Sequence, residues 1–577
     1  MVEKINRLKN WQAALLIALM GFAVYSIGLA NSFEGDDFGQ IINNTAVHSI
    51  MNIGKFFESG TYAGNGVNSL SGTYYRPLMT TVFSIIYTVF GPHPFYFHLF
   101  QLLVCIGSAI ILYLFFRYSF KPPLALFLSL VFLTHPIDSQ TVYAIPSMQD
   151  ALFFFFGILG VYLLVRYRSI RSLVCVALCL FLSLLAKESA MLFVIMSLIY
   201  LFWWNRKRFL TFLGIVLVPV GLWLLLRIHA VGVFSNPAGG PIDRLGLAGR
   251  LFTSPSIMLF YITKFVYPWK LASTYYWTYP TYSTSHFLFP LLIDLTVVVL
   301  IIYVASIIRK KAPKSMLYTY LFFAIWGAIG LGLLLQIVPL DMTACETWFY
   351  FPMVGFIGMI GVVFAVFPIR IQSHWLVILA IVFLTLFGTR TLIRGLDWRS
   401  QYELAKTDIA NSQDNSRAYS IIVYTLMQEG NYSGAKPYQT EALRIYPSYG
   451  GYVNYATILS QTGDYAGAVN AYKKSIPYGT RSSNLATYDT LGYYTLLTGS
   501  VASNKAYLVH ELHIYPKNSL LWMYLAFLEE KDNDNTDAKI AISNAKQYGK
   551  VPQYIYDHII KNQPFVLDLS GQPDDIP

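Results

Sequence analysis

The sequence predicts an all-α chain in which a polytopic helical membrane protein is followed by a soluble α-helical solenoid. Three observations support this fold class. First, 55% of the 577 residues are hydrophobic and only 12% are charged, which is about half the charged share of an ordinary soluble domain. Second, apolar runs long enough to span a bilayer recur as far as residue 389. Third, residues 1–394 carry 26 Lys and Arg against 12 Asp and Glu, whereas residues 395–577 carry 15 against 18.

This contrast in charge divides the chain into parts. We expect a transmembrane domain at 1–394, a linker at 395–415, a repeat domain at 416–550 and a C-terminal tail at 551–577. The positive charge of the first part lies in short clusters between apolar runs, as is typical of integral membrane proteins. Nucleic acid is therefore not expected as a partner.

Eleven apolar runs are interpreted as membrane spans. They are residues 11–30, 95–116, 122–134, 149–165, 172–186, 189–204, 209–228, 287–308, 316–340, 351–367 and 374–389. With these spans, six basic clusters fall on one side of the membrane, which the positive-inside rule assigns to the cytoplasm. They are Lys4/Arg7/Lys9, Arg117/Lys121, Arg166/Arg168/Arg171, Arg206/Lys207/Arg208, Arg309/Lys310/Lys311/Lys314 and Arg370. We therefore expect a cytoplasmic N-terminus and an extracytoplasmic C-terminal module, on the outer face of the plasma membrane or in the lumen of the endoplasmic reticulum of a eukaryote.

Two further apolar stretches, 76–90 and 255–269, would break the alternation of charge if they were spans. We expect them to be amphipathic or re-entrant segments on the outer face. The acidic residues of the first part also gather on that side, where Asp36 and Asp37 follow the first span, Asp150 begins a later one, and Lys187 and Glu188 lie between two spans. Because carboxylates are costly near lipid, this distribution indicates an outward-facing polar site.

The C-terminal part repeats with a period near 34 residues. Gly430-Asn-Tyr432-x-x-Ala435 matches Gly463-Asp-Tyr465-x-x-Ala468, and weaker copies follow around Leu491-Gly492 and Trp522. This is the tetratricopeptide period, and about four repeats fit. Such repeats stack into a solenoid with a concave groove for a peptide or a protein surface. The alternative is a structural stalk that binds no ligand.

Several motifs together resemble one family. They are Glu34-Gly-Asp36-Asp37, Tyr75-Arg76-Pro77-Leu78, His135-Pro136 running to Asp150, Ala186-Lys187-Glu188, Glu346-Thr-Trp348-Phe-Tyr350 and Asp397-Trp398-Arg399. In this order, with the trailing repeats, the chain resembles the transmembrane-and-tetratricopeptide O-mannosyltransferases. The resemblance implies a GT-C glycosyltransferase fold, an acidic pair in the first outer loop, a polyprenyl-phosphate sugar donor and transfer to Ser or Thr of a secreted protein. Gln140, Met148 and Thr347 depart from the family pattern, which leaves the sugar and the acceptor open.

The residue chemistry of the acidic pair agrees with such a reaction. Transfer from a polyprenyl phosphate needs a base for the acceptor hydroxyl but no general acid, because phosphate leaves as a stable anion. Asp36 or Asp37 supplies the base in this interpretation, and the pair is also a candidate site for Mg²⁺ or Mn²⁺. The alternative is that the two acids only cap the helix that follows them.

The leaving phosphate needs cations that are shielded from bulk water. Arg76 and Lys187 are expected to meet it at headgroup depth, and Arg390 and Arg394 either bind the donor or anchor the last span by snorkelling. His135 is a further candidate, although a histidine before a proline is more often a hydrogen-bonding residue at a helix end. The other site candidates are Asp150, Glu188, Glu346, Trp348 and Tyr350.

We therefore expect an inverting hexosyltransferase that moves a sugar, mannose by the resemblance, to a protein acceptor held by the repeats. One alternative is a GT-C transferase that acts on a lipid or a cell-envelope polysaccharide. Another is a non-catalytic membrane scaffold with a protein-binding tail. A transporter would place acids in the middle of the spans, where the sequence has none.

Overall fold

The computed structural model describes residues 8–62, 74–232, 240–367, 373–479, 501–551 and 556–557. The chain divides into two compact units, Met1–Asp414 and Asn415–Pro577. Helices make up the regular structure throughout the described residues. The predictions for Lys4, Arg7, Arg370, the repeat around Leu491-Gly492 and nearly all of the tail at 551–577 fall outside the described residues.

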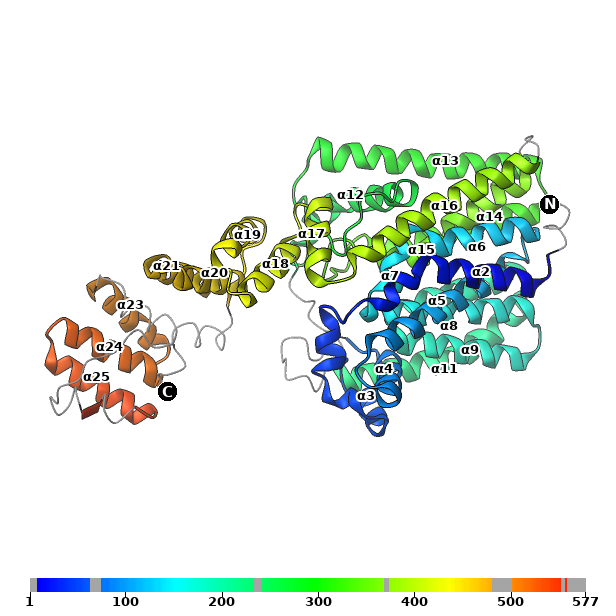
Figure 1. Cartoon of the computed structure of the whole chain (residues 1–577). Coiled ribbons are helices and arrows are strands. Elements are labelled where there is room, and N and C mark those ends of the chain that lie inside the picture. Colours follow the sequence, from blue (N-terminus) through cyan, green and yellow to red (C-terminus); the bar gives the residue numbers. More distant parts are fainter. Residues whose placement is uncertain are drawn as a thin grey trace. The chain divides into compact units, whose positions relative to one another are not determined.

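The first unit is a bundle of long apolar helices (Figure 1). Among the described residues, eight helical stretches are long and apolar enough to cross a membrane. In order they contain α2 (Asn10–Tyr25), α5 (Pro94–Phe116), α8 (Met148–Arg166), α11 (Arg206–Val231), α13 (Phe289–Lys311), α14 (Lys314–Leu334), α15 (Tyr350–Val366) and α16 (Ser373–Asp397). The all-α class with a multi-pass membrane part is therefore confirmed.

The other three predicted spans correspond to shorter apolar helices. These are α6 (Pro122–Thr134), α9 (Ile170–Ala186) and α10 (Met191–Trp204). The two stretches assigned to the outer face form α4 (Pro77–Phe90) and the second half of α12 (Leu247–Val266). Neither helix is among the eight that are long and apolar enough to span.

Small residues allow the helices to pack closely, as in many membrane bundles. A side chain at Gly355 would meet the backbone of Gly327, so α14 and α15 lie in direct contact there. At one end of the bundle the short helix α7 (Ser139–Tyr143) places the Tyr143 ring against Gly28 and Gly395. The Tyr143 hydroxyl lies 3.2 Å from the carbonyl oxygens of Val24 and Thr391. This buried ring ties α2, α7 and α16 together.

The predicted linker does not connect the units as a free segment. Its residues form the end of α16 and the helix α17 (Gln401–Asn411), and both belong to the first unit. Ser400 begins α17 because its side chain accepts a hydrogen bond from Glu403 N. The boundary between the units falls after Asp414, one residue before the predicted start of the repeat domain at 416. Figure 1 shows α3 (Ile53–Glu58), α4, α7 and α17 at the same end of the bundle.

The second unit consists of paired helices with a repeated turn. The described helices are α18 (Ser416–Gln428), α19 (Tyr432–Ile445), α20 (Tyr449–Gln461), α21 (Tyr465–Ser475), α23 (Val501–Ile514), α24 (Ser519–Lys531) and α25 (Asn535–Tyr548). Gly430, Gly463 and Asn533 each adopt a positive φ at the turn inside a pair, a conformation that Gly and Asn tolerate best. The next residue in each turn caps the second helix of the pair. A turn with one positive-φ residue followed by a capping Asn or Asp therefore recurs in each described pair.

Candidate functional site

The acidic pair lies in the loop after the first span, directly before the short helix η2 (Phe38–Ile42). Asp37 is buried, whereas Asp36 is half-buried. Oδ2 of Asp37 accepts a hydrogen bond from Glu34 N at 2.7 Å, and its side chain caps no N–H group of η2. The helix-cap alternative is therefore wrong for Asp37, which instead folds the loop back on itself.

Burial makes this loop electrostatically unusual. It raises the pKa of Asp37 well above the ordinary value, with smaller contributions from the negative charges of Asp36 and Glu34. Burial likewise raises the pKa of Glu34 from 4.5 to about 7, although the Ser32 hydroxyl and the Gln401 backbone favour the charged form. Burial therefore favours the neutral form of both Glu34 and Asp37 relative to a carboxyl group in water.

Four of the predicted charged residues form two ion pairs beside α4, α8 and α9. Nζ of Lys187 lies 2.6 Å from Oδ1 of Asp150, and both side chains are buried. The Arg76 guanidinium lies 3.8 Å from Glu188, whose side chain is 44% exposed. In the sequence, the only acidic neighbour of Lys187 is Glu188. In the structure, Lys187 forms its ion pair with Asp150, in the first turn of α8.

Arg76 is the less satisfied of the two cations. Its guanidinium lies 4.3 Å from the centroid of the Tyr74 ring, a cation–π geometry. Its Nε is buried and has no hydrogen-bond partner among the described residues. Glu188 is too far away for a hydrogen bond, so the guanidinium keeps donors for a ligand.

Two tyrosines connect the acidic loop to this cation. Gln40, on η2, donates through Nε2 to the Tyr62 hydroxyl at 2.8 Å. The Tyr62 and Tyr74 rings lie 6.3 Å apart, and the Tyr74 hydroxyl donates to Asp341 at 2.9 Å. The acidic pair and Arg76 therefore belong to one neighbourhood. Gln40 and Tyr62 were not among the site candidates expected from the sequence, and only their closeness to the motifs could have suggested them.

His135 is held at the end of α6 by both ring nitrogens. Nδ1 accepts from Ile137 N at 3.3 Å, and Nε2 lies 3.0 Å from the Phe265 carbonyl oxygen. Burial lowers the pKa of His135 to about 4. The ring is thus neutral near pH 7 and offers no positive charge to a phosphate.

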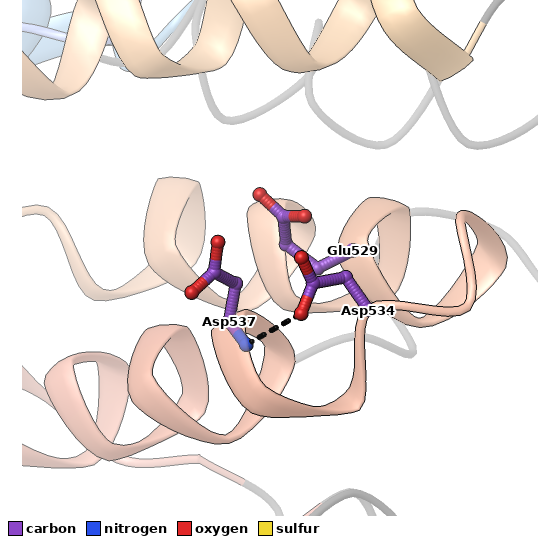
Figure 2. A group of neighbouring side chains, drawn as sticks. All are labelled: Glu529, Asp534 and Asp537. Carbon is purple, nitrogen blue, oxygen red and sulfur yellow. Dashed lines mark hydrogen bonds between the residues drawn. The ribbon is translucent and has the colours of Figure 1, made fainter.

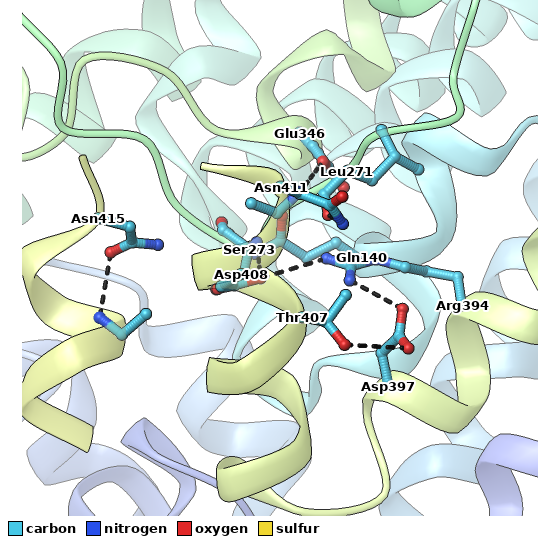
Figure 3. Close-up of polar contacts among 12 residues, drawn as sticks. Gln140, Leu271, Ser273, Glu346, Arg394, Asp397, Thr407, Asp408, Asn411 and Asn415 are labelled. Carbon is cyan, nitrogen blue, oxygen red and sulfur yellow. Dashed lines mark hydrogen bonds and ion pairs between the residues drawn. The ribbon is translucent and has the colours of Figure 1, made fainter. Parts of the chain in front are cut away.

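Arg394 is held by carboxylates of the protein (Figure 3). This fully buried guanidinium lies 3.0 Å from Asp397 and 3.7 Å from Asp408 on α17. Asp408 accepts hydrogen bonds from both the backbone N and the hydroxyl of Ser273. The arrangement fastens α17 to the bundle. Asp408 was not singled out because it lies in the predicted linker. The Ser400-x-x-Glu403 pattern, a helix-capping signal, could have revealed the helix α17 that carries it.

The remaining site candidates are Glu346, Tyr350, Trp348 and Arg390. Glu346 is buried and accepts from the Tyr275 hydroxyl at 2.9 Å and from Ala272 N at 2.8 Å. Tyr350 packs between Phe132 and Phe154 at ring distances of 4.7 and 4.6 Å, a core position. Trp348 is half-buried and lies in the short 3-10 helix Glu346–Phe349, directly before α15. Arg390 donates to the Trp269 carbonyl, away from the acidic loop's network.

One group of carboxylates in the second unit resembles a metal site. Among the described residues, the ligand atoms of Glu529, Asp534 and Asp537 all lie within 4.8 Å of one another. Figure 2 shows that Asp534 accepts a hydrogen bond from Asp537 N, which is the cap of α25. Glu529 is paired with Lys505. Because a helix cap and an ion pair explain the cluster, it gives no evidence of a bound metal.

Comparisons with known proteins agree with both parts of the chain. The tetratricopeptide repeat family matches residues 416–449 and 449–476. Protein O-mannosyl-transferase TMTC1 of Homo sapiens is 29% identical over 143 residues, which is 24% of this chain and 16% of the relative. The Mus musculus TMTC1 is 29% identical over 143 residues, 24% of this chain and 15% of the relative. Tmtc3 of Drosophila melanogaster is 25% identical over 188 residues, 31% of this chain and 20% of the relative.

The chain is similar to the TMTC protein O-mannosyltransferases. The resemblance drawn from the ordered motifs is confirmed, as are the tetratricopeptide repeats. The matched stretches span a fifth or less of each TMTC relative. Activity, substrates and partners of this TMTC-like chain are therefore matters for proposal.

Proposed function

We propose that this chain is a membrane glycosyltransferase that moves a mannosyl group from a polyprenyl-phosphate donor to a Ser or Thr hydroxyl of an extracytoplasmic protein. The mannosyl group and the protein acceptor rest on the printed names of the TMTC relatives. The observation that carries the proposal is the network that joins the acidic loop, through Tyr62 and Tyr74, to an arginine with unmet hydrogen-bond donors.

Asp36 supplies the base in this proposal. Its carboxylate takes the proton of the acceptor hydroxyl, whose oxygen forms a bond to the anomeric carbon of the sugar. The bond from that carbon to the phosphate oxygen breaks, and the phosphate leaves with the electron pair as an anion. One displacement from the opposite face inverts the anomeric configuration. Asp36 is favoured over Asp37 because it is half-buried and reachable, whereas the buried Asp37 holds the loop through Glu34 N.

Arg76 is placed against the donor phosphate. A guanidinium binds phosphate oxygens by paired, charge-assisted hydrogen bonds, and the long contact to a half-exposed Glu188 can be exchanged for such bonds. Lys187 is less suited because Asp150 already holds it at 2.6 Å in a buried pair. In this proposal, Lys187 and Asp150 position the ends of α8 and α9 around the donor.

Mg²⁺ or Mn²⁺ is a further part of the proposal. Oδ1 of Asp37 is buried and accepts no hydrogen bond within the described part of the chain, so this carboxylate retains an oxygen for a hard cation. Asp36 and Asp37 would hold the ion, and its charge would offset that of the donor phosphate. Treatment with EDTA, then addition of Mg²⁺, should abolish and restore binding of the donor. Donor binding unchanged by EDTA would exclude this part.

The repeat unit is proposed to present the protein acceptor, as its tetratricopeptide match suggests. Alanine substitution of the half-exposed Tyr438 on α19 should then raise KM for the acceptor without changing KM for the donor. An unchanged acceptor KM, or an equal effect on both substrates, would count against this role.

The main test uses the full chain reconstituted in lipid vesicles with polyprenyl-phosphate mannose and a Ser/Thr-rich peptide. Asp36→Asn should lower transfer by about 10²-fold or more, the scale expected for the loss of a general base. Asp37→Asn should give a smaller loss with a raised KM. Glu58→Gln removes an exposed acid of α3 and is the matched control. Wild-type activity of both Asp variants would refute the catalytic assignment, and a mannosidase specific for one anomer would test inversion.

A further inference from the structure

Three positive charges lie close together at the end of α12. They are carried by Lys264 on α12, Lys270 in the following turn and Arg390 on α16. Within the part of the chain that the structure describes, none of the three makes an ion pair with a carboxylate. We call these residues the Lys264–Lys270–Arg390 group. They differ from Lys187 and Arg394, each of which is held by a carboxylate.

Hydrogen bonds to two neighbouring carbonyls bring the group together. Arg390 donates through Nε and Nη2 to the Trp269 carbonyl oxygen, at 3.1 and 2.8 Å. Nζ of Lys264 donates to the next carbonyl, that of Lys270. A guanidinium has five N–H donors and an ammonium has three, so most donors in the group are not used by these bonds. The turn therefore gathers three cations and leaves them with donors to spare.

Two carboxylates, those of Glu346 and Asp397, act on this group, but only from beyond ion-pair distance. Burial lowers the pKa of Lys264, Glu346 opposes this shift, and the charges of Lys270, Arg394 and Arg390 add to it. Glu346 lies beyond ion-pair distance and is already bonded to Tyr275 and to Ala272 N. An arginine within a membrane-spanning helix is costly unless an anion or several polar groups compensate it.

Exposed apolar side chains flank the group. Val266, Tyr267 and Trp269 are 72%, 60% and 51% exposed, and the rings of Tyr267 and Trp269 stack at 6.2 Å. Trp and Tyr are enriched where a membrane protein meets the headgroup region, because their rings suit its mixed polarity. An occupant with both a phosphate and a hydrocarbon part satisfies the cations and the exposed rings together.

We propose that the Lys264–Lys270–Arg390 group binds the phosphate of an anionic membrane lipid, with Tyr267 and Trp269 contacting the lipid below its headgroup. Among the described residues no hydrogen bond or ion pair joins this group directly to Arg76 or to the acidic loop, and the proposal does not depend on the proposed transferase activity. By holding the turn after α12, the lipid would also support the Phe265 carbonyl that positions His135.

The test measures lipid binding by the full chain in detergent. Native mass spectrometry and thermal-shift titration are carried out with phosphatidylglycerol, with phosphatidylcholine of the same acyl chains and with inorganic phosphate. The wild type should retain phosphatidylglycerol preferentially. Lys270→Gln should weaken this binding about fivefold, which corresponds to about 1 kcal/mol for each basic residue near a membrane surface. Lys270 is exposed, so the substitution should not disturb folding.

Lys55→Gln is the matched control, because Lys55 is also exposed but lies on α3, away from the group. It should bind phosphatidylglycerol as the wild type does. Equal retention of phosphatidylcholine and phosphatidylglycerol would overturn the proposal, and so would an equal loss in Lys55→Gln and Lys270→Gln. Saturation by inorganic phosphate, with no gain from the lipid, would overturn the choice of a lipid as the occupant.

Discussion

The buried pair of Lys187 and Asp150 gives the most decisive prediction. With Nζ and Oδ1 2.6 Å apart and side chains 10% and 2% exposed, the two charges compensate each other out of water. Removing one partner leaves the other charge buried and alone, which typically costs about 3 to 5 kcal/mol. Lys187→Met and Asp150→Asn should each lower the free energy of unfolding by this amount. The double variant should recover most of the loss because it buries no net charge.

The pair of Arg76 and Glu188 is the internal contrast. Arg76 is buried, at 9% side-chain exposure, but Glu188 is 44% exposed and lies 3.8 Å away, so the pair is intermediate between a surface pair, which contributes about 0 to 1 kcal/mol, and a buried one. Glu188→Gln should therefore destabilise the fold less than Lys187→Met or Asp150→Asn. Removing Arg76 should instead raise KM for the polyprenyl-phosphate donor while leaving KM for the acceptor unchanged, since only the donor carries a phosphate.

The assay for the buried pair is equilibrium unfolding in mixed micelles, followed by tryptophan fluorescence, together with donor kinetics on the same preparations. We expect the Lys187→Met and Asp150→Asn double variant to regain both stability and a normal donor KM. A double variant as unstable as either single variant would refute the ion-pair argument. Recovered stability with a persistently high donor KM would show that Lys187 itself contacts the phosphate.

Three further predictions concern topology, pH and the repeats. In a background without the native cysteines, a thiol at Gly463 should be labelled from outside the cell and one at Lys311 should not; the reverse would overturn the assignment of sides. Because burial raises the pKa of Glu34 from 4.5 to about 7, its neutral form is favoured in the fold, and stability should fall as pH rises across this interval. Glu34→Gln should flatten that dependence in pH-dependent unfolding, and an unchanged profile would exclude Glu34 as its source. Asp464→Ala removes the cap of α21 and should cost about 1 kcal/mol in urea unfolding of the repeat unit, whereas no loss would mean that the cap is dispensable.

The fold followed from local patterns in the sequence. Long apolar runs and the repeated turn at Gly430 and Gly463 depend on residues near one another in the chain, so periodicity is sufficient to detect them. The helix α17 within the predicted linker at 395–415 was not anticipated, because the composition of this segment resembles a soluble connector. Its Ser400 cap marks α17, and the contact of Asp408 with Arg394 that fastens this helix is visible only in three dimensions.

The candidate site was less accessible to sequence reasoning for the same reason. A motif shows that Lys187 and Glu188 are adjacent in the chain, but the partner of Lys187 lies 37 residues away in Asp150. Similarly, the groups that hold the His135 ring are those of Ile137 and of the distant Phe265, and burial among the packed helices keeps the ring neutral. Residue type and position identified the charged groups, whereas their partners depend on how α4, α8, α9 and α12 pack.

The cations at this end of the bundle fall into two classes, according to whether a carboxylate lies next to them. Arg394 and Lys187 each have a carboxylate within hydrogen-bonding distance, so removing an anionic ligand would leave their charges compensated. Arg76 and the Lys264–Lys270–Arg390 group are different, because no carboxylate in the described part of the chain lies that close to them. A charge that the fold does not compensate is stabilised by a bound anion. Arg76 is connected to the helix after the acidic loop through Tyr74, Tyr62 and Gln40, where the proposed donor phosphate would react. The second group lies beside exposed aromatic rings, where a lipid would remain bound without reacting.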